Sequence, residues 1–481
     1  MNACCSTPTA AAAPDDINVS CRAPLFVLFG KAVGWLVAAS VLGLVASLKF
    51  HSPNILANCA CLTYGRVHAA AVNAQLYGFA VPAGLGVALW IIAQLGGIRV
   101  VQPGIIAFGA ALWNIGVLIG VIGILAGDST GFEKLEMPRY AAVILLLAFL
   151  LIGVATLFTL HDRRERRLTP PQWFLIAALF WFPWIFSTAY LLLTVCPVRG
   201  VMQPVIQWWF GGNFTFVWLS LTGLAAVFHF LPQFAGRTLH SSQLALFTFW
   251  TLILFGSWTG IPASAPLPAW MPALSGIATL LTLVTLISVG VNIFHTKQGG
   301  RVSSETSSAY RFVLFGLGMF QLAGLMRIAS VLPPVSAVTN FTWFTVAQAQ
   351  LNSFGFFSLV MLGAIYHIVP RVAGAEWPSA KSVRLHFWLA AVGILLVAVP
   401  LALGGVAQGF KLLDPAIAFQ DVSKATLPFL RAATTGELLI LFGNLLLAAN
   451  LLGLVVRCFR AKLVPAFASV TAEMKFAEVK P

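Results

Sequence analysis

The chain alternates long apolar stretches with short polar loops from near its beginning to near its end. Each stretch has about 20 residues or more, the length that a helix needs to cross the hydrocarbon core of a bilayer. Because lipid offers no partners for backbone amides, such stretches form helices rather than open strands. We count twelve of them, at residues 24–48, 69–96, 103–126, 140–160, 172–195, 204–232, 243–261, 269–294, 311–332, 342–369, 386–407 and 435–457. The pattern predicts an all-α integral membrane protein, a twelve-transmembrane-helix bundle.

The polar segments divide the chain into one membrane domain and two short tails. Residues 1–23 are expected to form a polar N-terminal tail, 24–460 the membrane domain and 461–481 a cytoplasmic C-terminal tail. The longest expected loops lie near 49–68 and 408–434, and neither is long enough for a soluble domain. The first twenty residues contain no apolar core before a cleavage site, so the first helix is expected to direct its own insertion.

Composition supports a membrane location. Hydrophobic residues make up 59% of the 481 residues and charged residues only 9%, whereas soluble domains carry about 25% charged residues. The formal net charge of +14 would suggest nucleic acid in a soluble protein. Here 18 of the 28 Lys and Arg fall on the side of the two termini and 9 on the other side, and cytoplasmic loops are enriched in these residues. We expect a multi-pass protein of the bacterial inner membrane, with both termini cytoplasmic, lipid around it and no nucleic-acid partner.

The seven cysteines have no spacing typical of a metal site. Cys59, Cys61 and Cys196 fall on expected loops of the outer face, where oxidation is chemically feasible. We expect free thiols, and a disulfide between Cys196 and one of the other two is the alternative.

Several motifs occur in the order of a known membrane-protein family. They are Thr63-Tyr64-Gly65-Arg66, Gln207-Trp208-Trp209-Phe210-Gly211 with Asn213, Trp258-Thr259-Gly260, and Tyr366-His367-Ile368-Val369-Pro370-Arg371-Val372. Over about residues 25–460 the chain resembles subunit I of the cbb-type, or C-family, cytochrome c oxidase of the haem-copper oxidase superfamily. The resemblance implies a twelve-helix bundle, in agreement with the count of apolar stretches. It also implies the family's reaction, which is the reduction of oxygen by cytochrome c.

The resemblance further implies six histidines that hold two haems and a copper ion, since imidazole suits both metals. Matching the flanking motifs places other residues at all six positions, namely Ala71, Gly212, Pro262, Ala263, Gln348 and Gln350. The family's tyrosine that is cross-linked to a copper ligand corresponds to Gly256. The chain is therefore identified as a degenerate member of the family, and no cofactor or metal is expected. Neighbouring aromatic side chains or lipid are expected to fill the haem-sized volume.

Among the eight remaining histidines, His68 lies three residues before Ala71, close to the same face of the helix. It is expected to be a polar residue near the outer helix end, and the alternative is that it is a ligand for a displaced haem. Within the expected spans the only acidic residue is Glu437, although ionisable residues inside a membrane normally mark proton relays. Buried amides are expected to bond between helices. A sharper alternative is that Gln348 and Gln350 bond each other or Asn213.

These observations predict a cytochrome c oxidase subunit I-like protein that is a non-catalytic paralogue. Its expected role is that of a structural or assembly subunit of a respiratory-chain membrane complex, beside other subunits of that complex. One alternative is a redox-active oxidase subunit that carries a displaced haem on His68. The other alternative is a permease that reuses the emptied cavity.

Overall fold

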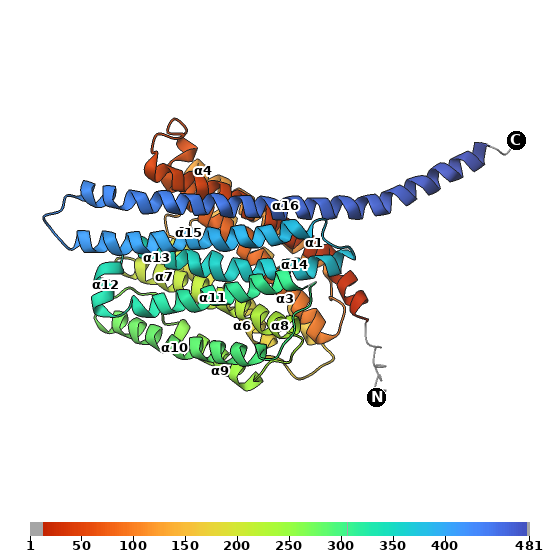
Figure 1. The fold of residues 1–481 in the computed structure, drawn as a ribbon, viewed down its shortest axis with the longest axis horizontal. Helices are drawn as coiled ribbons and strands as arrows, with labels where there is room; N and C mark the ends of the chain where they lie inside the picture. The colour runs from red at the N-terminus through yellow and green to blue at the C-terminus, as the bar shows by residue number, and fades with distance from the viewer. Residues whose placement is uncertain (1–12, 305, 479–481) are drawn as a thin grey trace.

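The computed structural model describes residues 13–304 and 306–478, with side chains up to residue 460. The described residues form helices and no strands (Figure 1). In chain order the elements are α1 (Pro14–His51), η1 (Ala60–Leu62), α2 (Tyr64–Asn73), η2 (Ala74–Ala80), α3 (Val81–Gly96), α4 (Pro103–Ala126), α5 (Arg139–His161), α6 (Pro170–Tyr190), η3 (Leu191–Val195), α7 (Met202–Gly212), η4 (Asn213–Trp218), α8 (Leu219–Phe234), α9 (Ser242–Gly256), α10 (Trp270–Lys297), α11 (Ser307–Ala329), α12 (Pro333–Thr339), α13 (Trp343–Gln350), η5 (Leu351–Ser358), α14 (Leu359–Ala373), α15 (Ala380–Leu412) and α16 (Phe419–Glu478). The prediction of an all-helical membrane bundle is confirmed.

Eleven continuous helical segments in the described part of the chain are long and apolar enough to cross a membrane. The remaining expected span, 243–261, corresponds to α9, which has only 15 residues. The helix ends at Gly256 and a loop follows that contains Pro262, Pro266 and Pro268. Proline has no backbone N–H to continue a helical ladder, which explains why the apolar pattern extends further than the helix.

Three of these segments form the centre of the bundle. They are Tyr64–Gly96, Met202–Phe234 and Trp343–Ala373, and 100%, 89% and 89% of their most apolar windows are buried, against 39–50% for the other eight. Each of the three is an α-helix interrupted by a π-helical segment, which is η2, η4 or η5 respectively. Single π-helical turns occur frequently at functional sites. The sequence pattern did not predict these interruptions.

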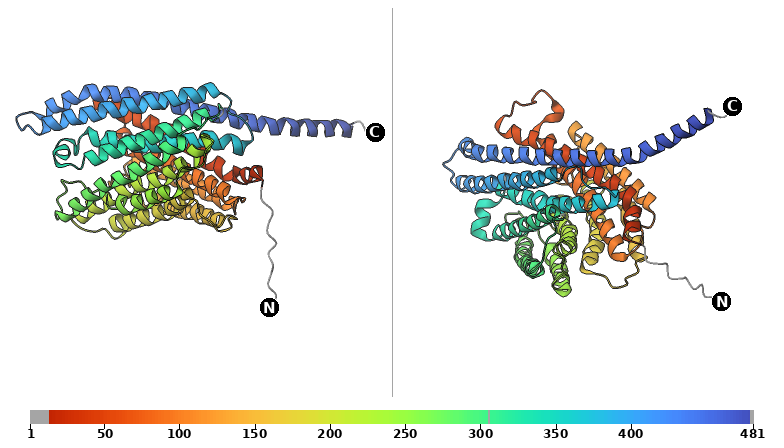
Figure 2. Two further views of the ribbon diagram at one scale, coloured as in Figure 1. Left: turned by 60° about the horizontal axis from the view of Figure 1, so that its bottom comes forward. Right: turned by 45° about the vertical axis from the view of Figure 1, so that its right-hand side comes forward.

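The two described ends of the chain lie at the same end of the bundle (Figure 1), and Figure 2 shows the same arrangement from two other sides. Residues from distant segments contact one another at this end of the bundle. The Arg99 guanidinium pairs with the Asp16 carboxylate at 2.7 Å, and Arg22 donates to the carbonyl of Val372 at 2.9 Å. The assignment of this end to the cytoplasm stays a prediction.

The tails and loops differ from those expected. Residues 14–23, expected within a polar tail, belong to α1, whose N1 proline and first-turn acids suit a helix start. Ile17 and Cys21 of this turn are buried. The expected loop 408–434 is reduced to residues 413–418 by the long antiparallel pair α15 and α16. Residues 461–478 continue α16 rather than starting a separate tail, and residues 1–12 and 479–481 lie outside the described residues.

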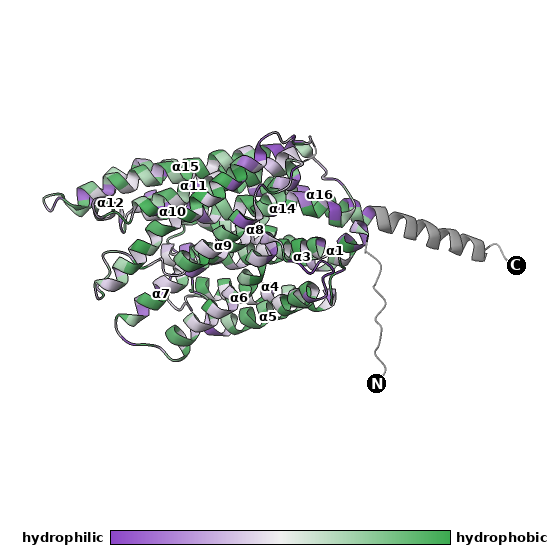
Figure 3. Cartoon of the chain, turned by 90° about the horizontal axis from the view of Figure 1, so that it is seen from below, coloured by the Kyte–Doolittle hydropathy of each residue, from purple (hydrophilic) through white to green (hydrophobic). Residues whose placement is uncertain are grey.

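Hydrophobic residues dominate the helices (Figure 3), and several buried polar groups bond across helix interfaces. Asn444 donates to the Ser40 hydroxyl at 2.8 Å, and Gln321 donates to the Leu286 carbonyl at 3.1 Å. Between α9 and α10, the Thr248 and Ser288 hydroxyls are 2.7 Å apart and those of Thr251 and Thr285 3.0 Å apart. Side-chain hydrogen bonds of this kind associate helices in lipid, as predicted for the buried amides. Among the described residues all five cysteines are free thiols: Cys21, Cys59, Cys61, Cys196 and Cys458.

Candidate functional site

The six positions that the resemblance assigns to metal ligands gather at two cavities. The larger cavity has a volume of about 790 Å³ and lies between α7, α10, α11 and α13 and the loop after α9. Four of the six positions line it, namely Gly212, Pro262, Ala263 and Gln348. Packing thus brings together residues from three distant parts of the chain, as the resemblance implied.

The smaller cavity has a volume of about 140 Å³ and contains the other two positions, Ala71 and Gln350. His68 and Glu437 also line it. The His68 ring stacks on the Tyr64 ring, with their centroids 5.4 Å apart. The only acidic residue of the expected spans therefore shares a cavity with the candidate haem ligand.

The expectation was that aromatic side chains or lipid fill the vacated volume, and in the larger cavity aromatic side chains do not fill it. Trp208 and Phe216 line the cavity but leave it open, and much of the remaining wall consists of small residues such as Gly211, Gly276 and Ala273. Small side chains on several facing elements leave a void that their neighbours do not reach. The smaller cavity agrees better with the expectation, because Phe50, Phe354 and Trp343 contribute to its wall.

Glycine at position 212 is required by close backbone packing. A Cβ atom at this position would lie 2.6 Å from the carbonyl oxygen of Thr259 and 3.3 Å from the Cα of Gly260. Gly260, on the loop after α9, is also close to α7. It has a φ of +120°, and a Cβ atom added to it would lie 2.8 Å from the Trp208 carbonyl oxygen. The end of α7 and the loop after α9 therefore touch through two glycines, and an imidazole at position 212 has no room.

Neither cavity fits the family's haem and copper groups. The lining of the larger cavity holds amides, hydroxyls and charged groups but no imidazole or thiolate, which are the ligands that haem iron and copper use. The smaller cavity offers one imidazole, from His68. Its volume of about 140 Å³ is below the roughly 300–1,000 Å³ of sites that enclose drug-sized ligands. Among the described residues no group of three or more His, Cys, Asp or Glu could hold a metal ion.

The two glutamines do not form the network that was the alternative to general bonding between helices. Gln348 lines the larger cavity and Gln350 the smaller one. Asn213 instead donates to the carbonyls of Trp209 at 2.9 Å and Ser257 at 3.1 Å, and accepts from the Trp181 indole at 3.1 Å. Because Gln348 and Gln350 are two positions apart on a helix, their side chains point to different faces, which explains why they are separated.

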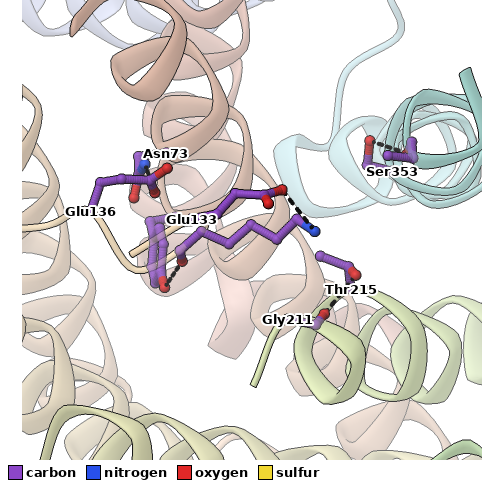
Figure 4. A network of polar contacts seen from close by, with 9 residues as sticks. Asn73, Glu133, Glu136, Gly211, Thr215 and Ser353 are labelled. Atoms are coloured by element: carbon purple, nitrogen blue, oxygen red, sulfur yellow. Dashed lines mark hydrogen bonds and ion pairs between the residues drawn. The ribbon is translucent and has the colours of Figure 1, made fainter. Parts of the chain in front are cut away.

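Glu133 and Lys134, in the polar loop between α4 and α5, line the larger cavity, and Figure 4 shows the polar contacts around them. Asn73 donates to the Glu136 carboxyl at 2.7 Å, and the Tyr77 hydroxyl donates to the Lys134 carbonyl at 2.7 Å. Burial raises the pKa of Glu136, and the hydrogen bond from Asn73 opposes that shift. The Lys134 ammonium, 3.2 Å from the Glu133 carboxylate, lowers the pKa of Glu133. Asn73 lies next to η2, so this contact ties the loop to a central helix.

Sequence reasoning missed the charged residues that line the larger cavity, which are Arg327, Lys134 and Glu133. Arg327 was counted only among the basic residues on the side opposite the termini, and the structure places it in α11, where it lines the larger cavity. Its guanidinium donates to the Thr259 hydroxyl and lies over the Phe216 ring, 4.0 Å from the ring centroid. A useful signal was present, because Arg327 falls inside the expected span 311–332.

Comparison with known proteins gives the family of the chain. The family model for Cytochrome C and Quinol oxidase polypeptide I matches residues 24–439. The chain belongs to this oxidase subunit I family. It is 23% identical to the Cbb3-type cytochrome c oxidase subunit CcoN1 of Stutzerimonas stutzeri, over 78% of this chain and 81% of that protein. It is also 23% identical to cytochrome c oxidase subunit 1 of Rhodobacter capsulatus, over 89% and 84% of the two chains.

A third relative of the oxidase subunit I family is the bacteroid cytochrome c oxidase subunit 1 homolog of Bradyrhizobium diazoefficiens, which is 23% identical over 87% of this chain and 80% of its own length. These relatives support the resemblance to the cbb-type subunit. They also support a multi-pass protein of a bacterial membrane. The matches cover most of each chain, so the family fold extends over the whole membrane domain.

Proposed function

We propose that this member of the oxidase subunit I family does not reduce oxygen and acts as a structural or assembly subunit of a respiratory membrane complex. The observation that carries the proposal is the chemistry of the larger cavity. It gathers four of the positions where the resemblance expects ligands, and its lining offers no imidazole or thiolate. The preserved bundle then supplies a surface for partner subunits without a reaction centre inside it.

The packing around Gly212 supports the same proposal. A side chain at this position would meet the Thr259 and Gly260 backbone, so the bundle is built around the absence of a ligand there. A haem-copper centre needs several ligands at once, each oriented by further hydrogen bonds. Such an arrangement is not present around the larger cavity.

The direct test is the cofactor content of the purified full-length chain. We expect haem and copper well below one per chain, no Soret band of stoichiometric intensity, and no oxygen uptake with reduced cytochrome c. The variant His68→Ala should not change the spectrum, and neither should His240→Ala, a control outside both cavities. About one haem per chain that is lost in His68→Ala and kept in His240→Ala would establish the redox-active alternative instead.

The proposed role as a subunit of a membrane complex needs a separate measurement. We expect that gentle detergent extraction of native membranes, followed by purification through a tag on this chain, recovers other membrane subunits in fixed ratio to it. Deletion of the chain should lower the amount of that assembled complex. Recovery of the chain alone from native membranes, with assembly of respiratory complexes unchanged on deletion, would contradict the proposed role.

A further inference from the structure

Arg327 is a cation inside the membrane domain whose charge is not balanced by an acid. Among the described residues Arg327 takes part in none of the ion pairs. It lies in the membrane helix α11, two residues before the helix ends at Ala329. Its recorded partners are the Thr259 hydroxyl and the Phe216 ring. A guanidinium carries five N–H donors, so most of its donors are not used by these contacts.

The surroundings of Arg327 leave one net positive charge in the larger cavity. Its charged lining residues are Arg327, Lys134 and Glu133, and the last two pair with each other at 3.2 Å. Ionisable residues within membrane segments are rare and usually have a partner or a function. An oxyanion in the cavity would pair with the arginine, and a guanidinium can bind carboxylate or phosphate through two parallel hydrogen bonds.

The cavity also has an apolar side that faces outward from the bundle. Ile277 and Leu280 of α10 line it and are exposed by 56% and 38%. The exposed face of a membrane helix contacts lipid, so the cavity is reachable from the hydrocarbon region. Trp270 at the start of α10 is 65% exposed, which suits the interfacial level where tryptophan is enriched. Arg327, near the end of α11, lines the same cavity as Val331 and as Gly276 of α10.

We propose that the larger cavity binds an anionic amphiphile. Its oxyanion head pairs with the Arg327 guanidinium near the membrane surface, and its apolar chain lies against Ile277 and Leu280. This inference rests on the proposed absence of haem from the cavity. The proposed ligand comes from the bilayer, as an anionic phospholipid, and a soluble oxyanion from the aqueous phase is the competing candidate for the same guanidinium.

The test is thermal unfolding of the full-length chain in detergent micelles during titration with dioleoyl phosphatidylglycerol. We expect a saturable rise of the unfolding midpoint, and a half-saturating lipid concentration at least tenfold higher in Arg327→Gln, because a charge-assisted pair is lost. Arg327→Lys keeps the positive charge but lacks the two parallel N–H donors of the guanidinium, so its half-saturating lipid concentration should be intermediate. The matched control is Arg199→Gln, an exposed arginine outside the cavity, which should bind like the unchanged chain.

A variant that fills the cavity and a second probe, inorganic phosphate, distinguish the proposed ligand from the other possible results. Ala273→Trp fills the cavity from an exposed position of α10 and leaves Arg327 in place, so it should abolish the shift even if Arg327→Gln does not fold. Inorganic phosphate tests the soluble source, and an Arg327-dependent shift with phosphate but not with lipid would overturn the amphiphile. Equal shifts in the unchanged chain, Arg327→Gln and Ala273→Trp, or no shift with either probe, would overturn the site. The haem content of the same samples reports separately on the proposed function.

Discussion

Gly212 illustrates at the residue scale how packing can require glycine at a position where the resemblance implies a copper ligand. The Cβ of Gly212→Ala would meet the Thr259 carbonyl oxygen at 2.6 Å, and overpacking of this kind costs about 1–3 kcal/mol. We expect Gly212→Ala to lower stability in detergent by that amount, and Gly212→His to lower it further without gaining haem. The control Gly34→Ala meets no atom within 4 Å and should be neutral or slightly stabilising. An unchanged melting temperature in Gly212→Ala would contradict the close approach.

Glu136 and Glu133 should respond to pH in opposite directions. Burial raises the pKa of Glu136, so its protonated form is favoured by folding and stability falls as pH rises from the ordinary glutamate pKa, about 4.3, through the raised value. Lys134 lowers the pKa of Glu133, so its contribution is present above about pH 4.3 and is lost as pH falls through the lowered value. We expect Glu136→Gln to remove the first dependence and Glu133→Gln the second. Denaturation measured across pH in both variants checks this, and identical profiles would contradict it.

At the scale of elements, the hydroxyl contacts between α9 and α10 hold the 15-residue helix α9 to its neighbour. The Thr251 and Thr285 hydroxyls are 3.0 Å apart and both residues are buried. Hydrogen bonds between membrane helices contribute about 0.6 kcal/mol on average. A double-mutant cycle of Thr251→Val and Thr285→Val should give a coupling of about that size. Strictly additive losses would show that the contact does not stabilise the pair.

In the three central helices, the π-helical segments coincide with the positions that the resemblance assigns to metal ligands. Each of the segments η2, η4 and η5 begins within three residues of a position that the resemblance assigns to a ligand: Ala71 precedes η2, Gly212 precedes η4 and Gln350 precedes η5. A π-helical turn rotates the following residues relative to the preceding ones. The cavity walls therefore depend on backbone geometry that hydrophobic periodicity does not reveal.

At the scale of the whole molecule, we expect the alternating helices to place residues 165 and 418 on opposite sides of the membrane. Both positions are exposed, in the loop after α5 and before α16 respectively. In a variant whose native cysteines are replaced, we expect Glu165→Cys to react with a membrane-impermeant maleimide only from the cytoplasmic side and Ala418→Cys only from the outer side, following the Lys and Arg distribution. Labelling of both from the same side would contradict the topology.

The amino-acid sequence by itself determined the class of the protein and the identity of the residues at its centre. Apolar stretches of membrane length specify helices because lipid leaves backbone groups no other partner, and the family motifs located Ala71, Gly212, Pro262, Ala263, Gln348 and Gln350. These inferences depend on local composition and order along the chain. For that reason they hold without any knowledge of how the helices pack.

Tertiary structure decided the properties that arise between elements far apart in the chain. The open volume of about 790 Å³, the Gly212–Gly260 contact and the place of Arg327 in the cavity wall each depend on several helices at once. The same holds for the burial of Glu136 beside Asn73, 63 residues away in the sequence. Hydropathy describes whether a residue prefers lipid or water, but the size of a void and the partner of a charge are set by the packing of neighbouring side chains.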